Sequence, residues 1–149
     1  MRVRGMAAVL LGAGLLACSA ESDGTDTETG TDTEGYDLSR VVNSDGGSYT
    51  LSYVPDPDPI PPVSNFALLL TLTDSASGDP VLGADLELDA TMPEHNHGMN
   101  TQPPVTEENG GEYRVDGMQF HMSGHWQMEF QIRKDDVVET AVFHAVCCE

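Results

Sequence analysis

The sequence predicts an all-β fold, in particular an antiparallel β-sandwich. Three observations support this prediction. Five segments alternate apolar and polar residues with a period of two, turn-forming runs such as "SASGDP" and "ENGGE" separate the expected strands, and no segment has an apolar stripe at helical spacing. Strands that pack one face on a core and leave the other in water produce this alternation, and many short strands of this kind are typical of a sandwich.

The first expected strand covers residues 46–54, where Tyr49, Leu51 and Tyr53 share one face. The run "PDPDPIPP" follows it. Proline has no N–H to donate, so we expect this run to be a crossover or an edge rather than part of a central ladder. The next strand, residues 65–74, directs Phe66, Leu68, Leu70 and Leu72 to the core.

Four more strands are expected at residues 84–90, 111–118, 125–132 and 137–146. The first three alternate cleanly, with Leu86, Tyr113 and Trp126 among their inward residues. The last is apolar on both faces, which predicts a central strand.

The N-terminal residues have the layout of a secretory signal, with two arginines, an apolar run of eleven residues and a small-residue site. That run is too short for a membrane-spanning helix. "LLAC" resembles the lipobox of bacterial lipoproteins, which predicts a signal peptide at 1–17 and lipidation of Cys18. An ordinary signal peptide cut near Ala20 is the alternative. Ser19 slightly favours the outer membrane, with the domain on the periplasmic side.

Residues 18–35 are acidic and rich in Thr, Asp, Glu and Gly, so we expect a disordered tether between the lipid and a single domain at 36–149. Removing the signal peptide takes away Arg2 and Arg4, two of the six basic residues, while all 25 acidic residues stay. The formal net charge of −19 thereby becomes −21. A surface this acidic repels nucleic acid and permits cation binding.

Histidine and methionine gather in one part of the chain. After residue 17 there are five of each, and nine of these ten lie between Met92 and Met128. By strand parity Met118, Met122 and Met128 point inward, and Met92 either caps the core or binds a metal. In an extended "MPEHNHGMN", His95, His97 and Met99 would share one face, with the histidine Cα atoms about 7 Å apart. His121 faces away from its core-facing neighbours, whereas His125 and His144 are expected to be exposed.

Imidazole with thioether sulfur favours copper, and thioethers select Cu(I). We therefore expect His95, His97 and Met99 as primary copper ligands, with Met92 or His121 completing the set. The alternative is a loop whose histidines face water and whose methionines close the end of the sandwich. Cys147 and Cys148 leave three possibilities open: a vicinal disulfide, a pair of metal thiolates or a reactive free pair.

Two motifs resemble the YtkA-like domain family, which is similar to the FixH group of membrane-anchored domains. They are "MPEHNHGM" and "YRVDGMQFHMSGHWQMEFQI". The matching residues are Met92, Pro93, His95, His97, Gly98 and Met99 in the first and Tyr113, Val115, Gly117, Met118, Phe120, Met122, Gly124 and Trp126 in the second. The family often has proline where Ser123 stands, and the position of His125 is variable. The resemblance implies an immunoglobulin-like β-sandwich in the cell envelope, and FixH-like relatives are associated with copper handling during oxidase assembly.

Together these observations predict a lipid-anchored envelope domain that binds copper as a chaperone, buffer or sensor and meets an envelope copper-handling protein. The alternative function is a metal-free immunoglobulin-like interaction module. No Ser/His/Asp or Cys/His constellation is evident in the sequence, so we expect no catalytic residues and no enzyme.

Overall fold

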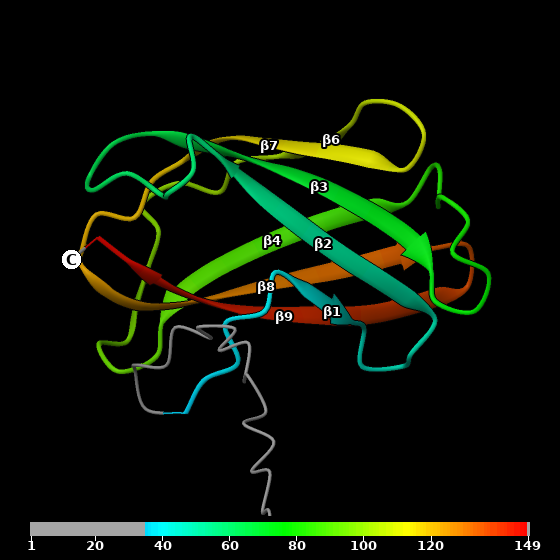
Figure 1. Ribbon diagram of the computed structural model, residues 1–149, viewed down its shortest axis with the longest axis horizontal. Coiled ribbons are helices and arrows are strands. Elements are labelled where there is room, and N and C mark those ends of the chain that lie inside the picture. The colour runs from blue at the N-terminus through cyan, green and yellow to red at the C-terminus, as the bar shows by residue number, and fades with distance from the viewer. Residues whose placement is uncertain (1–34, 149) are drawn as a thin grey trace, which may run out of the picture. The chain divides into compact units, whose positions relative to one another are not determined.

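The computed structural model describes residues 35–148. The predicted signal peptide, the lipidation at Cys18 and all of the predicted tether except Gly35 lie outside these residues. Within them the chain forms nine β-strands and no helix, arranged as two antiparallel sheets that face each other (Figure 1). The same residues accordingly include no helix long and apolar enough to cross a membrane. The structure confirms the predicted all-β sandwich, and its immunoglobulin-like type stays a prediction.

Hairpins and longer connections join the strands of each sheet. The five-stranded sheet has the order β1 (Val41–Asn43), β2 (Tyr49–Asp56), β3 (Phe66–Asp74), β7 (Glu112–Met118) and β6 (Val105–Glu107). The four-stranded sheet has the order β5 (His97–Gly98), β4 (Asp85–Met92), β8 (Gly124–Lys134) and β9 (Val137–Cys147). All six predicted strands are therefore confirmed, and β1, β5 and β6 are short additions. The proline run ends β2 and connects it to β3.

The core lies between the two sheets and includes the predicted inward residues of the first five expected strands, together with Ala141, Phe143, Ala145 and Cys147 of β9. Phe120 and Trp126 stack with their ring centroids 4.4 Å apart, and Phe66 meets Phe120 edge-on at 5.1 Å. Met118 and Met128 are fully buried, as predicted, and Met122 is half-buried against the core. The Trp126 indole N–H donates to the Met122 carbonyl at 3.0 Å, which satisfies the polar atom of the largest core side chain.

The prediction that 137–146 forms a central strand is wrong, because β9 is the last strand of its sheet and pairs with β8 alone among the strands of that sheet. Its two faces differ. Ala141 and Phe143 are buried, whereas Val138 is 57% exposed and Val142 is 36% exposed. Valine favours a strand through its β-branched shape even where it meets water, so its presence on both faces does not require burial.

Glu139 of β9 binds the β1–β2 turn across the gap between the sheets. Its carboxylate accepts hydrogen bonds from the hydroxyls of Ser44 and Ser48 and from the Ser48 backbone N–H, the last at 3.0 Å. These bonds lower the pKa of the Glu139 carboxyl, the Ser44 hydroxyl having the largest effect. A carboxylate bonded in this way holds the edge of one sheet to the edge of the other.

Candidate functional site

The "MPEHNHGMN" segment folds as a tight β-hairpin. Met92 pairs with His97 and Thr91 pairs with Gly98, and residues 93–96 form the turn. Asn96 has a φ of +53°, a left-handed conformation that asparagine tolerates better than most residues. The expectation of an extended segment with His95, His97 and Met99 on one face is therefore wrong, because the chain reverses direction between the two histidines.

The structure places the five predicted ligands in two different environments. His95 and His97 are exposed, whereas Met92 is fully buried and Met99 and His121 are half-buried. The His121 ring meets Trp126 edge-on at 5.5 Å, and its Nδ1 atom is buried without a hydrogen-bond partner. Within residues 35–148, no three His, Cys, Asp or Glu side chains lie close enough together to hold a metal ion.

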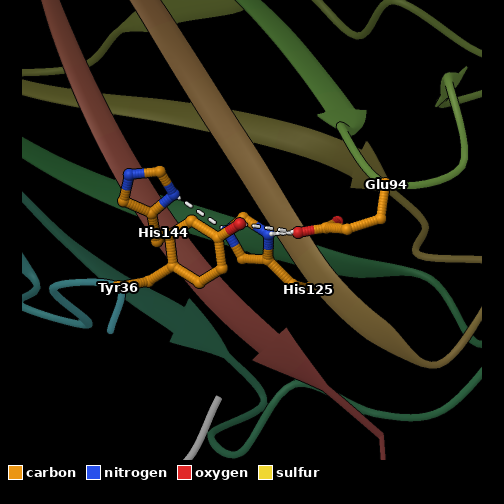
Figure 2. A network of polar contacts seen from close by, with 4 residues as sticks. All are labelled: Tyr36, Glu94, His125 and His144. Carbon is orange, nitrogen blue, oxygen red and sulfur yellow. Dashed lines mark hydrogen bonds and ion pairs between the residues drawn. The ribbon is translucent and has the colours of Figure 1, made fainter. Parts of the chain in front are cut away.

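A second group of polar side chains lies on the outer face of the four-stranded sheet, next to the hairpin. His125 is the second residue of β8 and pairs with Val146, and His144 of β9 pairs with Gln127, so the two histidines are diagonal neighbours on adjacent strands. Glu94, from the hairpin turn, and Tyr36, near the start of the described chain, complete the group (Figure 2). We call Tyr36, Glu94, His125 and His144 the histidine pair cluster.

Hydrogen bonds join all four members of the histidine pair cluster in one chain, drawn as dashed lines in Figure 2. The Tyr36 hydroxyl donates to Glu94 Oε1 at 2.8 Å, and the same oxygen is 2.8 Å from His125 Nδ1. On the other side of the ring, His125 Nε2 is 2.9 Å from His144 Nδ1. Tyr36 also covers His125, its ring stacking at 3.7 Å with an angle of 13° between the planes.

His125 is buried, which corrects the expectation that it is exposed. Only 4% of its side chain is accessible, because Tyr36 packs over a ring that would otherwise face water. His144 is half-buried, so its expected exposure is also wrong.

The family model described as YtkA-like matches residues 42–131, well over half of the chain. The chain belongs to the YtkA-like family. No curated protein and no solved structure matches it. The matched residues include the hairpin, His121 and His125, whereas Tyr36 and His144 lie outside them. The histidine pair cluster of this YtkA-like domain therefore combines two residues of the matched region with two that flank it.

Electrostatics in the YtkA-like domain favour an ionised Glu94 and a neutral His144. The hydrogen bond from Tyr36, then one from the backbone and one from His125, lower the pKa of Glu94 to about 2. Burial lowers the pKa of His144, and the neighbouring His125 lowers it further. With Glu94 charged, His125 donates from Nδ1. In the neutral form of His125 its Nε2 then accepts from the His144 Nδ1–H.

The end of β9 resolves one open question of the sequence. Cys147 and Cys148 form a vicinal disulfide, with Cys147 buried and Cys148 half-buried. Of the three possibilities left open for these residues, the structure therefore has the disulfide.

Sequence reasoning missed the histidine pair cluster because its members are far apart along the chain. Tyr36 and Glu94 are 58 residues apart, and only the pairing of β8 with β9 brings His125 beside His144. One signal was available: His125 and His144 both sit at outward positions of strands that were correctly predicted, where a polar contact between neighbouring strands is possible.

Proposed function

We propose that this YtkA-like domain binds copper in the cell envelope through its β4–β5 hairpin. The copper-binding part, which we call the hairpin rim, consists of the turn at residues 93–96 and the residues 97–99 that follow it. The domain acts as a chaperone, buffer or sensor for copper rather than as an enzyme. His95, His97 and Met99 are the primary ligands, and Met92 or His121 completes the set. The observation that carries the proposal is that two exposed histidines lie in one tight hairpin, His95 in the turn and His97 in β5.

Three further features support copper at this rim. Thioether sulfur prefers Cu(I), and Met99 lies directly after the short strand that contains His97. The Nδ1 atom of His121 is buried and makes no hydrogen bond, so within the described chain no other group occupies this nitrogen. The formal net charge of −19 attracts cations. Met92 is fully buried beneath the turn and is the least accessible of the proposed ligands.

The cellular setting is part of the same proposal. Acylation at Cys18 anchors the protein to the membrane, on the periplasmic side and with the outer membrane slightly favoured. The acidic tether then lets the domain reach a copper-handling protein of the envelope. The acidic surface disfavours nucleic acid as a partner.

Titration with Cu(I) under reducing conditions, against a coloured chelator, tests the proposal on the purified full chain. The His95→Ala/His97→Ala/Met99→Ala variant should lose Cu(I) that the parent protein retains at micromolar affinity or better. Met92→Leu is the matched control, since leucine keeps the buried volume and removes only the sulfur; retention in this variant assigns Met92 to the core. Equal or absent binding in the parent and the triple variant would refute copper binding here and favour the metal-free interaction module.

A further inference from the structure

The histidine pair cluster places two imidazole nitrogens against each other on the outer face of the sheet. His125 Nε2 and His144 Nδ1 are 2.9 Å apart, and neither belongs to the hairpin rim proposed above. Both come from paired strands of one rigid sheet, so their spacing does not depend on a loop. Two nitrogens held this way are a chelating pair as well as a hydrogen-bonded one.

We propose that His125 Nε2 and His144 Nδ1 bind a divalent copper ion at a second site, separate from the hairpin rim. Nitrogen ligands lie about 2.0–2.1 Å from such an ion, so two nitrogens 2.9 Å apart subtend an angle of about 90° at it. A right angle is the preferred ligand angle of tetragonal Cu²⁺. Tetrahedral zinc would require the nitrogens to be about 3.3 Å apart. The rings therefore need to tilt toward a common point and need not separate.

Glu94 supports this role from behind His125. A metal-bound histidine usually donates its second ring N–H to a carboxylate, which fixes the tautomer and raises the basicity of the ligating nitrogen. The bond between His125 Nδ1 and Glu94 Oε1, at 2.8 Å, has this arrangement. Tyr36 in turn holds Glu94 through its hydroxyl and restrains the His125 ring by stacking. Glu94 and Tyr36 thereby hold the Nε2 edge of His125 beside His144.

Binding leaves the proton count unchanged. Without metal, the proton on His144 Nδ1 fills the space between the rings. When Cu²⁺ enters, His144 takes the other tautomer, with its proton on Nε2. His144 lines a pocket of about 200 Å³ through which water reaches its ring. No third His, Cys, Asp or Glu of the described chain converges on the same point. The site thus offers two protein ligands and leaves the remaining positions to water.

Titration of the full chain with Cu²⁺ alone, without reductant, tests the second site. Electron paramagnetic resonance and spin-echo modulation count the imidazoles bound to copper. The His95→Ala/His97→Ala variant removes the hairpin ligands and should still bind one Cu²⁺ with two imidazoles. Adding His144→Asn should weaken binding at least tenfold and remove one imidazole, because the Asn amide nitrogen keeps the N–H donor to His125 but has no available lone pair, and its carbonyl oxygen is a weaker ligand for Cu²⁺ than imidazole.

Glu94→Gln, made in the same background, tests the supporting carboxylate separately and should weaken Cu²⁺ binding about 10- to 100-fold. Unchanged fluorescence of the single tryptophan verifies that each variant is folded. Cu²⁺ binding that His144→Asn leaves unaltered would overturn the second site, as would loss of all Cu²⁺ in the His95→Ala/His97→Ala variant. The latter result would still support the hairpin rim, so the two proposals fail independently.

Discussion

Gly111 lies against the backbone of Leu72, so close that a methyl group on Gly111 would be 2.8 Å from the Leu72 carbonyl oxygen and 2.8 Å from Pro80 Cβ. The contact is part of the β3–β7 pairing, where the Leu72 N–H donates to the Gly111 carbonyl at 2.9 Å. Its neighbour Gly110 has open space around the same position. Both have a positive φ, +80° for Gly111 and +61° for Gly110.

The two glycines give a matched pair of substitutions. Gly110→Ala should cost about 1–2 kcal/mol for the left-handed backbone alone. Gly111→Ala should cost this and a further ~1–3 kcal/mol for overpacking. Urea denaturation followed by tryptophan fluorescence measures both free energies of unfolding. Equal losses in the two variants would show that the backbone moves away from the new methyl group at no cost.

Glu139 predicts a pH dependence of stability. Its pKa is lowered in the folded state by Ser44 and Ser48, so its stabilising effect is complete above the unfolded pKa, near 4.5. That effect is lost as the pH falls from there through the lower, folded value. Glu139→Gln should therefore destabilise the protein at pH 7 and flatten the fall in stability below pH 4.5. Urea midpoints from pH 7 to pH 3 measure the change. Glu129→Gln, an exposed substitution with the same charge change, is the control; identical curves for the two variants would contradict the prediction.

The aromatic stack in the core should be the largest single contributor to stability among the side chains described. Phe120 is fully buried between Phe66 and Trp126. Phe120→Ala should lower the free energy of unfolding by about 3–5 kcal/mol and shift the tryptophan emission to the red as water approaches the indole. Val138→Ala, at an exposed position, should change stability by less than about 0.5 kcal/mol. If the Phe120→Ala protein were as stable as the parent, the surrounding core would have closed the cavity that the missing ring leaves.

Tyr36 should control access to His125. Its ring covers the imidazole at 3.7 Å, and its hydroxyl donates to Glu94. Tyr36→Ala should expose His125 and speed its modification by diethyl pyrocarbonate, detected by mass spectrometry. Tyr36→Phe keeps the covering ring and should leave that rate nearly unchanged. If both variants react at the rate of the parent protein, some other group shields His125.

The strands could be predicted well because the alternation of apolar and polar residues involves only positions within the same strand. Each strand with Leu, Tyr or Phe at every second position lies where the pattern places it, and the core methionines Met118 and Met128 follow from the same parity. The resemblance of two motifs to the YtkA-like family is confirmed by the match over residues 42–131. These features depend on neighbours only a few residues away.

The errors arise where the outcome depends on contacts between distant segments. Strand order decided that β9 is an edge, and the valines on its two faces do not report it. Turn geometry at Asn96 decided that His95 and His97 do not share a face. Tyr36 decided that His125 is buried, although the two residues are far apart in the sequence. A period-two pattern contains no information about any of these three.

The edge position of β9 affects how readily the protein aggregates at high concentration. An unpaired strand edge recruits other extended chains and starts aggregation. Here both backbone polar groups of Thr140 are bonded to Asp45. The Thr140 carbonyl accepts from the Asp45 N–H at 2.8 Å, and the Thr140 N–H donates to Asp45 Oδ1 at 2.9 Å. Farther along β9, Pro59 and Ile60 line the same pocket as His144, Ala145, Val146 and Cys148. Proline has no backbone N–H that an added strand could bind. A foreign strand thus finds only a short free length of β9 on which to dock.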